Sequence, residues 1–436
     1  MIRLKVKNDC FNPFFGWAVI FWFYNSFLFA QLQWQALTPP FSNTNNQRFD
    51  DVFFLNEMEG WALNGYYAGV YKTTDGGLTW VTQLTESQLG GNYYFRNIEF
   101  LNSQIGFVGT LNNKFYKTID GGVTWSEVTN ITTTTTPAIC GLDAVGNSTI
   151  YGCGAYFSPA YVIKSIDSGA TWQFIDMSPY AEALVEVLFL DENTGFVSGK
   201  NANGAVVLKT IDGGLNWTAI YNGAIQGEFV WKLQVLSSNS NVIFGSIEAA
   251  SPNPGKLLKS IDGGQTWITK IAPESNIQAV GFMTENHGWM GGHTTGFYET
   301  FDGGDTWIST GVGSNLNRIF ILNQNLAYAS GTGVYKYTQS LGGSSFTEYD
   351  RNPLKVKIAP NPVNDVLTFS IEFTEPDHLV MELYDTSGKF LKQLMLDEVL
   401  KPSLVQYSFP FEYSAGVYFL NLHSNTGRQS LRFVKN

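Results

Sequence analysis

The sequence is poor in the side chains that bind metals, phosphates or cofactors. Its 436 residues include only 4 His and 3 Cys, and charged residues make up 14% of the total. No histidine or cysteine grouping has metal-ligand spacing, and no glycine-rich loop joins a strand to a helix, so we expect neither a metal site nor a cofactor. The formal net charge of −11 also argues against nucleic acid as a partner, because phosphate binding needs a concentrated basic surface.

Long hydrophobic runs are absent after residue 30. The first 30 residues have the pattern of a secretory signal peptide, because Arg3, Lys5 and Lys7 precede an apolar run that ends at Ala30. We therefore expect residues 1–30 to be removed during export. An uncleaved membrane anchor is the alternative, although the apolar run is short for a membrane span.

Cysteine is too scarce to be the main support of a chain of this size. Only Cys140 and Cys153 remain after the predicted signal peptide. In an oxidising compartment the two cysteines could form a disulfide between neighbouring strands. Two buried free thiols are the alternative, and the sequence leaves both open.

Aromatic residues and glycine are abundant by contrast, and they recur in one motif. The pattern [S/T]-x-D-x-G-x-[T/N]-W occurs six times, first at residues 73–80. Its aspartates are Asp75, Asp120, Asp167, Asp212, Asp262 and Asp302, and its tryptophans are Trp80, Trp125, Trp172, Trp217, Trp267 and Trp307. Successive aspartates are 45, 47, 45, 50 and 40 residues apart, which is the period of a propeller blade.

The residue types of this motif predict a β-hairpin turn. The Asp side chain accepts hydrogen bonds from backbone N–H groups further along the chain, and the following Gly takes positive φ without steric cost. The Thr hydroxyl ties the far side of the hairpin, and the Trp ring packs into apolar space between layers. We therefore interpret the six copies as structural.

The motif lies inside a larger unit of four short strands. In the first unit the strand-like residues 52–56 and 60–63 precede the motif, and similar pairs precede later copies. After the sixth copy, residues 319–337 supply three strands but no motif, and residues 32–36 resemble the strand that follows the tryptophan elsewhere. We therefore predict an all-β fold with a β-propeller of about seven blades over residues 31–342, in which residues 32–36 complete the last blade and remove an open edge. Six or eight blades are the alternatives.

These repeats resemble the Asp-box (BNR) propellers and, within them, the photosystem II stability and assembly factor family. The motif of that family begins with lysine, K-[S/T]-x-D-G-G-x-T-W. Here the leading position is held by Lys72, Lys117, Lys164, Lys209 and Lys259. The resemblance covers roughly residues 31–342. It implies a protein-binding propeller that aids the assembly of a membrane complex.

A linker over residues 343–353 separates the propeller from a second domain at residues 354–436. About seven short strands in this segment predict an Ig-like β-sandwich. Three features resemble the type A sorting domain of the type IX secretion system: the Pro360-Asn361-Pro362 turn, the turn that ends at Gly388, and Gly416-Val417-Tyr418, with Lys435 near the terminus. The resemblance implies the secretion machinery as a partner, passage through the outer membrane, and release of the propeller or its attachment to the cell surface.

A secreted, sialidase-like glycoside hydrolase is the alternative function, because Asp-box propellers include sialidases. Such a site needs an arginine cluster for the substrate carboxylate, a Tyr/Glu nucleophile pair and an acid/base carboxyl group. The predicted propeller holds only Arg48, Arg96 and Arg318. Since no residue can be assigned as the nucleophile, we predict no catalytic residues and no enzyme.

Basic residues in the predicted innermost strands are the candidate binding residues. They are Arg96, Lys232 and Arg318. Facing the mouth of the central channel, they would contact an acidic partner. The alternative is that they pair with acidic residues on the same ring, namely Asp51, Glu99 or Glu186. We therefore predict a secreted or surface-attached propeller that binds a protein or a glycan. A purely structural surface protein without a discrete ligand is a further alternative that the sequence leaves open.

Overall fold

The computed structural model describes residues 32–38, 45–91, 93–132, 137–154, 156–157, 159–339, 355–373, 379–385, 390–396, 403–424 and 428–435. The predicted signal peptide and the predicted linker lie outside these residues. In the part that the structure describes, no helix is long and apolar enough to cross a membrane. The one short helix in these ranges, α1 (Glu86–Leu89), connects the first two blades.

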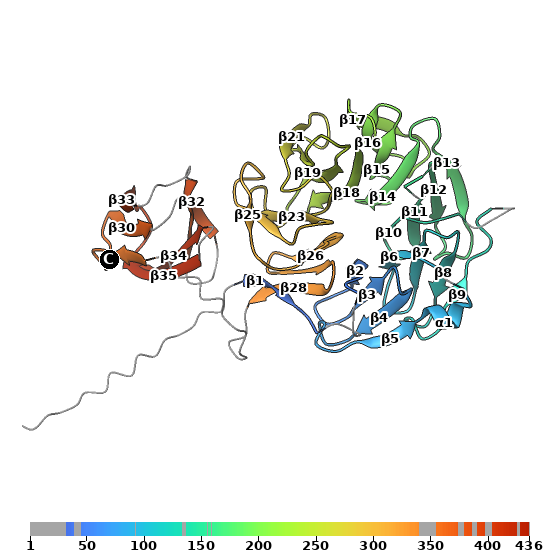
Figure 1. Cartoon of the computed structure of the whole chain (residues 1–436), viewed down its shortest axis with the longest axis horizontal. Coiled ribbons are helices and arrows are strands. Elements are labelled where there is room, and N and C mark those ends of the chain that lie inside the picture. Colours follow the sequence, from blue (N-terminus) through green and yellow to red (C-terminus); the bar gives the residue numbers. More distant parts are fainter. Residues whose placement is uncertain are drawn as a thin grey trace, which may run out of the picture.

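Six consecutive four-stranded antiparallel sheets follow the chain, and in each the first strand lies nearest the central axis (Figure 1). They are β2 (Phe49–Phe54), β3 (Gly60–Asn64), β4 (Gly69–Thr73), β5 (Val81–Leu84); β6 (Phe95–Phe100), β7 (Gly106–Thr110), β8 (Phe115–Thr118), β9 (Ser126–Glu127); β10 (Gly141–Val145), β11 (Thr149–Cys153), β12 (Tyr161–Ser165), β13 (Gln173–Asp176); β14 (Ala183–Phe189), β15 (Gly195–Asn201), β16 (Gly204–Thr210), β17 (Thr218–Asn222); β18 (Phe229–Leu236), β19 (Asn239–Glu248), β20 (Lys256–Ser260), β21 (Ile268–Ile271); and β22 (Ile277–Phe282), β23 (Gly288–Gly292), β24 (Tyr298–Thr300), β25 (Ile308–Ser309).

The seventh sheet joins the two ends of the propeller. It contains β26 (Arg318–Asn323), β27 (Leu326–Ser330), β28 (Val334–Gln339) and, as its outer strand, β1 (Leu32–Ala36). β1 runs antiparallel to β28 in a register that pairs Leu32 with Gln339 and Ala36 with Tyr335. The predicted seven-bladed fold and its closure by residues 32–36 are confirmed. Closure gives β28 a partner strand, so the seventh blade has four strands like the others.

Each Asp-box folds as the predicted hairpin turn. In the first copy, Asp75 accepts hydrogen bonds from the backbone N–H of Thr79 at 2.9 Å and from its hydroxyl at 2.5 Å. Thr73 donates to the same carboxylate at 2.8 Å and accepts from the N–H of Gly77, which has φ of 92°. Because these donors stabilise the ionised form, they lower the pKa of Asp75 to about 2.

The leading lysine of the motif links neighbouring blades. In three copies its Nζ atom donates to the carbonyl of the first glycine in the Asp-box of the next blade, and it lies over an aromatic ring of its own second strand. In the fifth copy, Lys259 donates instead to the carbonyl of Glu285 at 2.8 Å. The three glycine links are Lys72 to Gly121 at 3.4 Å, Lys164 to Gly213 at 2.8 Å and Lys209 to Gly263 at 3.1 Å; Lys336, which belongs to no Asp-box, makes the same link to Gly76 at 3.0 Å. The last of these connects blade seven to blade one.

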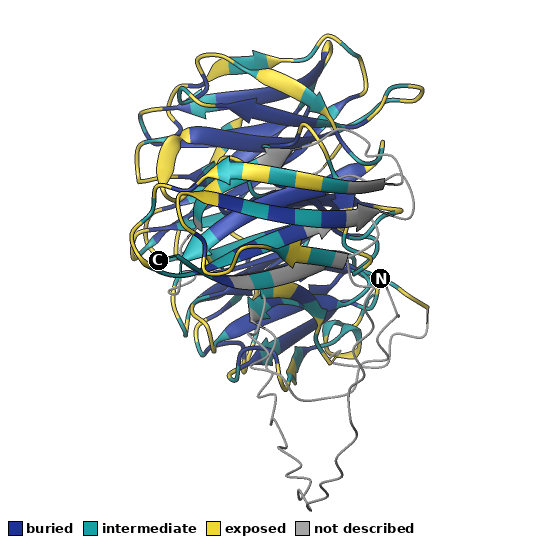
Figure 2. Cartoon of the chain, turned by 90° about the vertical axis from the view of Figure 1, so that its left-hand side faces the viewer, coloured by how far each residue is buried: buried dark blue, intermediate teal, exposed yellow. Residues whose placement is uncertain are grey.

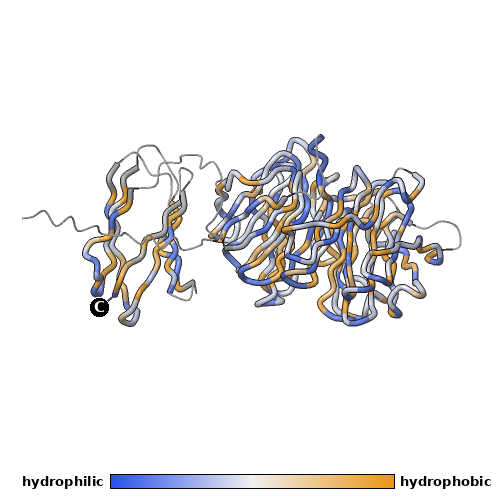
Figure 3. The backbone as a smooth tube through the Cα atoms, turned by 90° about the horizontal axis from the view of Figure 1, so that it is seen from below, coloured by the Kyte–Doolittle hydropathy of each residue, from blue (hydrophilic) through white to orange (hydrophobic). Residues whose placement is uncertain are grey.

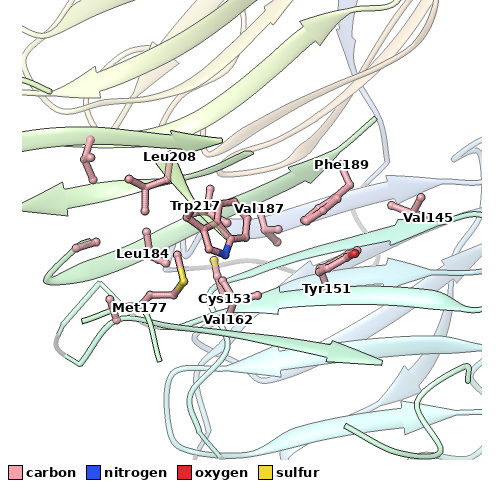
Figure 4. Packing of buried hydrophobic residues seen from close by; sticks show 14 residues of the cluster. Val145, Tyr151, Cys153, Val162, Met177, Leu184, Val187, Phe189, Leu208 and Trp217 are labelled. Carbon is pink, nitrogen blue, oxygen red and sulfur yellow. The ribbon is translucent and has the colours of Figure 1, made fainter. Parts of the chain in front are cut away.

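Aromatic stacks fill the space between blades. Phe189, near the end of the inner strand of blade four, stacks on Tyr151 of blade three at 3.5 Å and meets the Asp-box residue Trp217 edge-on at 6.2 Å (Figure 4). The same arrangement recurs for Phe54 with Tyr328 and Trp80, Phe100 with Trp61 and Trp125, and Phe282 with Phe244 and Trp307. The motif tryptophans therefore pack between layers as the sequence predicts.

The C-terminal strands form two sheets packed face to face, which confirms a sandwich. One contains β29 (Lys355–Ile358), β30 (Val366–Phe373) and β33 (Ser403–Pro410); the other contains β32 (Phe390–Leu396), β31 (Leu379–Asp385), β34 (Gly416–Ser424) and β35 (Arg428–Lys435). Apolar side chains from both sheets make one core. The sandwich strands nearest the viewer in Figure 2 show the alternation of buried and exposed residues expected when one face is solvated, and Figure 3 shows apolar residues along the strands of both domains.

Candidate binding site in the central channel

A β-bulge in the innermost strands brings extra side chains to the centre of the propeller. The register between the first and second strands shifts at Asp50, Arg96, Val185, Trp231 and Gln278. A bulge places two consecutive residues opposite one, so both can point to the same side of a strand. These residues are buried, and we call them, with Cys140 and Asn317 at the same place in blades three and seven, the bulge ring.

Arg96 closes the channel at the bulge ring. Its guanidinium group lies 2.9 Å from the carboxylate of Asp50 and 5.4 Å from the ring centre of Trp231, which belongs to blade five. Trp231 in turn packs with Cys140 and Val185. Arg96 thus spans from blade two across the centre, and the ring is filled by side chains.

Asp50 collects three donors from this end of the propeller. Besides Arg96, it accepts from Nε of Arg48 at 3.0 Å and from the hydroxyl of Tyr94 at 3.2 Å. Burial and the charge of Asp50 raise the pKa of Tyr94 to about 12, so its hydroxyl remains protonated and donates at neutral pH. Arg48 also donates to Gln278 at 3.0 Å, and its side chain is partly exposed. Two arginines thus share Asp50, and Glu248, which accepts from Gln278 at 2.8 Å, adds a second carboxylate close to both of them.

Lys232 and Arg318 lie one residue further along the inner strands. Lys232 pairs with Glu186 at 2.6 Å, and Arg318 lies 3.4 Å from Asp51. Both line a cavity of about 200 Å³ whose walls include Leu233, Val280, Ile319 and Phe320. Arg96 is not among the residues that line this cavity.

Two further carboxyl groups lie near Arg318. Burial raises the pKa of Asp143 to about 7, against the lowering effect of the Phe189 N–H group and of Arg318. Burial and the charge of Asp143 raise the pKa of Glu99. Four carboxyl groups, counting Asp51 and Glu186, thus share this level with two cations, and protonation offsets part of the excess negative charge.

The three predicted residues are therefore on innermost strands but do not form one patch. Each has an acidic partner. Lys232 pairs with Glu186 and Arg318 with Asp51, and both of these partners are named in the alternative that basic residues pair with acidic residues on the same ring. Arg96 pairs with Asp50, which that interpretation did not include. A binding role for the three residues stays a prediction.

The sequence reasoning missed Asp50, Arg48 and Trp231. One signal was present, because consecutive polar residues interrupt the apolar alternation at Asp50-Asp51 and at Arg96-Asn97. Such a break in period is the mark of a bulge.

Exposed aromatic side chains surround the end of the channel that Arg96 closes. Tyr66 lies between β3 and β4, and Tyr156 and Phe157 lie between β11 and β12. Because these loops precede the third strand of a blade, they lie on the propeller face where the inner strands begin and opposite the Asp-box hairpins. We call this the aromatic face. Tyr156 lies 6.5 Å from Trp231, ring centre to ring centre, so this loop of blade three reaches the bulge ring.

The two cysteines lie in blade three as buried free thiols. The N–H of Cys140 donates to the carbonyl of Cys153 at 2.9 Å, so the backbones are adjacent. The side chains belong to different clusters, since Cys140 packs in the bulge ring and Cys153 packs between blades three and four (Figure 4). Of the two alternatives that the sequence left open, the structure has the free thiols. No group of three or more metal-ligating side chains occurs in the ranges that the structure describes.

Comparisons with known proteins confirm both resemblances. Residues 28–150 match the family model described as photosynthesis system II assembly factor YCF48, and residues 357–436 match the secretion system C-terminal sorting domain. The photosystem II assembly lipoprotein Ycf48 of Synechococcus sp. (strain CC9902) is 26% identical over 192 residues, which cover 42% of this chain and 54% of that protein. The match thus spans about half the length of this curated relative.

Two solved structures share the fold at low identity. A YCF48 bound to a D1 peptide is 17% identical with a TM-score of 0.54, and the match covers 71% of this chain and 97% of that one. PorZ, a surface component of the type IX secretion system of Porphyromonas gingivalis, is 15% identical with a TM-score of 0.52, and the match covers 92% of this chain and 61% of that one. The chain is therefore a secreted or cell-surface β-propeller that resembles the YCF48 assembly factors and carries a secretion system C-terminal sorting domain.

Proposed function

We propose that the propeller binds an extended segment of a partner protein on its aromatic face and does not chemically alter it. The observation that carries the proposal is the combination of exposed Tyr156 and Phe157 with Trp231, which lies 6.5 Å from Tyr156 and itself packs against Arg96. Tyrosine, tryptophan and arginine are the side chains that contribute most at protein interfaces. A propeller of the same fold has been solved with a bound peptide, which supports a peptide segment as the ligand.

We assign the partner segment an acidic group that meets the arginines of this face. Arg48 and Arg96 both contact Asp50, Glu248 lies near both of them, and Arg48 remains partly exposed. A carboxylate from the partner would meet the partly exposed guanidinium group of Arg48, whose planar donors suit a carboxylate, while Arg96 is buried below it with Asp50. Lys232 and Arg318 face the cavity deeper in the channel, so we assign them a secondary role in this proposal.

The glycoside hydrolase alternative is less well supported by the geometry. Among the described residues, Arg48 and Arg96 meet at Asp50, while Arg318 lies at the other level beside Asp51. Sialidase-like recognition of a substrate carboxylate would need these arginines to converge. The arrangement therefore supports binding without turnover.

The test is capture of a partner by the full chain from envelope extract of the source cells. The variant is Tyr156→Ala with Phe157→Ala, which removes two exposed side chains without opening the core. The matched control is Ile211→Ala, an exposed apolar residue in an Asp-box on the opposite face. We expect one envelope protein to be retained by wild type and by the control, and its retention to fall about tenfold in the variant.

Three results would contradict the proposal. Equal retention by wild type and the double variant would remove the aromatic face as the site. Retention that survives protease treatment of the extract but not glycosidase treatment would make the ligand a glycan. Release of sugar from a sialoside by the purified chain would support the hydrolase alternative instead.

A further inference from the structure

One strand of the C-terminal sandwich is buried on both faces. In β31, Leu379, Met381 and Leu383 point into the sandwich core. Val380 and Glu382 alternate with them and so point to the opposite side of the sheet, yet they are only 3% and 4% exposed. An outward-facing valine and glutamate can be this buried only if another part of the molecule covers them.

The sixth blade of the propeller provides that cover. Val380 packs with Phe301 and Ile308, which lie at either end of the sixth Asp-box hairpin, between and at the ends of β24 and β25. Figures 1 and 3 both show the sandwich beside the outer edge of the propeller that carries this blade. The contact is apolar, and all three side chains are at most 6% exposed.

The sixth Asp-box differs from the other copies at Phe301, which meets the sandwich, and at Glu299, two residues before it. Copies two to five place isoleucine where the sixth has Phe301, and these isoleucines, Ile119, Ile166, Ile211 and Ile261, are 63–74% exposed. All five earlier copies have lysine where the sixth has Glu299. The next blade has no Asp-box, so a lysine here would have no glycine carbonyl to bind.

Glu299 instead helps to fix the surface on which the sandwich lies. Its carboxylate lies 3.0 Å from Nε2 of His287, and the His287 ring stacks on Phe301 at 4.6 Å between ring centres. On the sandwich side, Tyr384 donates to Glu382 at 2.6 Å. Burial raises the pKa of Tyr384, with further contributions from Glu382, Tyr337 and Glu299, so this tyrosine lies close to blades six and seven.

We propose that the sixth Asp-box is a docking site for the sorting domain of the same chain. In this arrangement Phe301 and Ile308 receive Val380, and His287 and Glu299 orient Phe301. The contact holds the sandwich against the propeller in solution, so that the two domains move as one body. The outer face of β31 is then covered, and the secretion machinery would have to recognise the sorting domain through other surfaces, such as the sheet of β29, β30 and β33.

The first experiment compares hydrogen exchange and small-angle scattering of the full chain with Val380→Asp. We expect the variant to raise the exchange rate of amides in Tyr298–Ser309 about tenfold and to increase the radius of gyration. Val366→Asp, on an exposed position of β30, is the matched control in the sandwich, and Ile261→Asp is its counterpart in the fifth Asp-box. Both controls should behave as wild type.

A second experiment does not depend on a disruptive variant. Ile308→Cys with Val380→Cys should be joined by a short bis-maleimide reagent in the full chain, whereas Ile261→Cys with Val380→Cys should not. Failure of the first pair to cross-link, or scattering in which wild type already behaves as two independent bodies, would overturn the proposal. Loss of exchange protection throughout β34 of Val380→Asp would show that the sandwich itself is unfolded, and the cross-link would then decide.

Discussion

The Asp-box hairpins, which we call the rim, and the central channel belong to the same repeated blades. The residues at equivalent positions repeat at the rim but differ in the channel. At the rim, each Asp-box repeats the same short-range hydrogen bonds, such as Asp120 with Thr118 and Thr124. In the channel, equivalent positions carry different residues, for example Asp50, Arg96 and Trp231 in the bulge ring. Repetition at the rim specifies the fold, while variety at the centre gives one molecule its own surface.

The energetic consequence is that breaking a buried ion pair in the channel should cost more than breaking a partly exposed pair in the outer strands. Lys232→Met would leave the carboxylate of Glu186 buried without its cation. We expect a loss of about 3–5 kcal/mol in the free energy of unfolding, measured by urea denaturation. The control is Lys114→Met, which breaks the pair with Glu127 at the same 2.6 Å distance but at a partly exposed site. It should cost about 1 kcal/mol or less, and equal losses in the two variants would refute the contrast.

The channel should also make stability depend on pH in a way that the rim does not. The pKa of Asp143 is raised from 3.8 to about 7, so between these values the folded chain holds more protons than the unfolded chain. Stability from this group therefore falls as pH rises from 4 to 7. Because of this group, the free energy of unfolding of wild type should fall by an amount on the order of 2 kcal/mol between pH 5 and pH 8, and Asp143→Asn should remove that fall. Thermal unfolding of both proteins across that pH range would test this. The same dependence of stability on pH in wild type and in Asp143→Asn would contradict it.

A link between blades at the rim should have an intermediate effect. Lys336→Met removes the hydrogen bond to Gly76 that connects blade seven to blade one, and we expect a loss of about 1–2 kcal/mol. Lys209→Met removes the equivalent link to Gly263 inside the ring. Similar losses in the two variants are expected from chemical denaturation. A much larger loss for Lys336→Met would mean that the closing blade is held differently from the others.

The smallest effect concerns the single rim copy that departs from the turn pattern. Ser168 has φ of 58°, whereas the other copies have glycine there. Ser168→Gly should raise the free energy of unfolding by about 0.5–1 kcal/mol, since glycine adopts this conformation without steric cost. The reverse change in the fourth copy, Gly213→Ser, should lower it by a similar amount. Differential scanning calorimetry of both variants would test this. Changes in stability of the same sign in the two variants would contradict it.

The same contrast explains how far the sequence could be read. The Asp-box turns were predictable because all their partners lie within eight residues, and the closing strand was predictable because residues 32–36 resemble the strand after each tryptophan. The partner of Arg96 could not be predicted, because Asp50 lies 46 residues away and a bulge changes which side chains face the channel. The departure of the sixth copy at Glu299 and Phe301 is visible in the sequence, but only the fold shows that the sandwich lies there.

The seam between β1 and β28 has a mechanical consequence. Leu32 pairs with Gln339, so the chain enters β1 and leaves β28 at the same end of the strand pair. Tension applied between the two ends of the propeller would therefore break the hydrogen bonds between β1 and β28 one pair after another and not all at once. For a protein held at a cell surface and pulled through its other end, the ring would open at this seam before any other sheet yields.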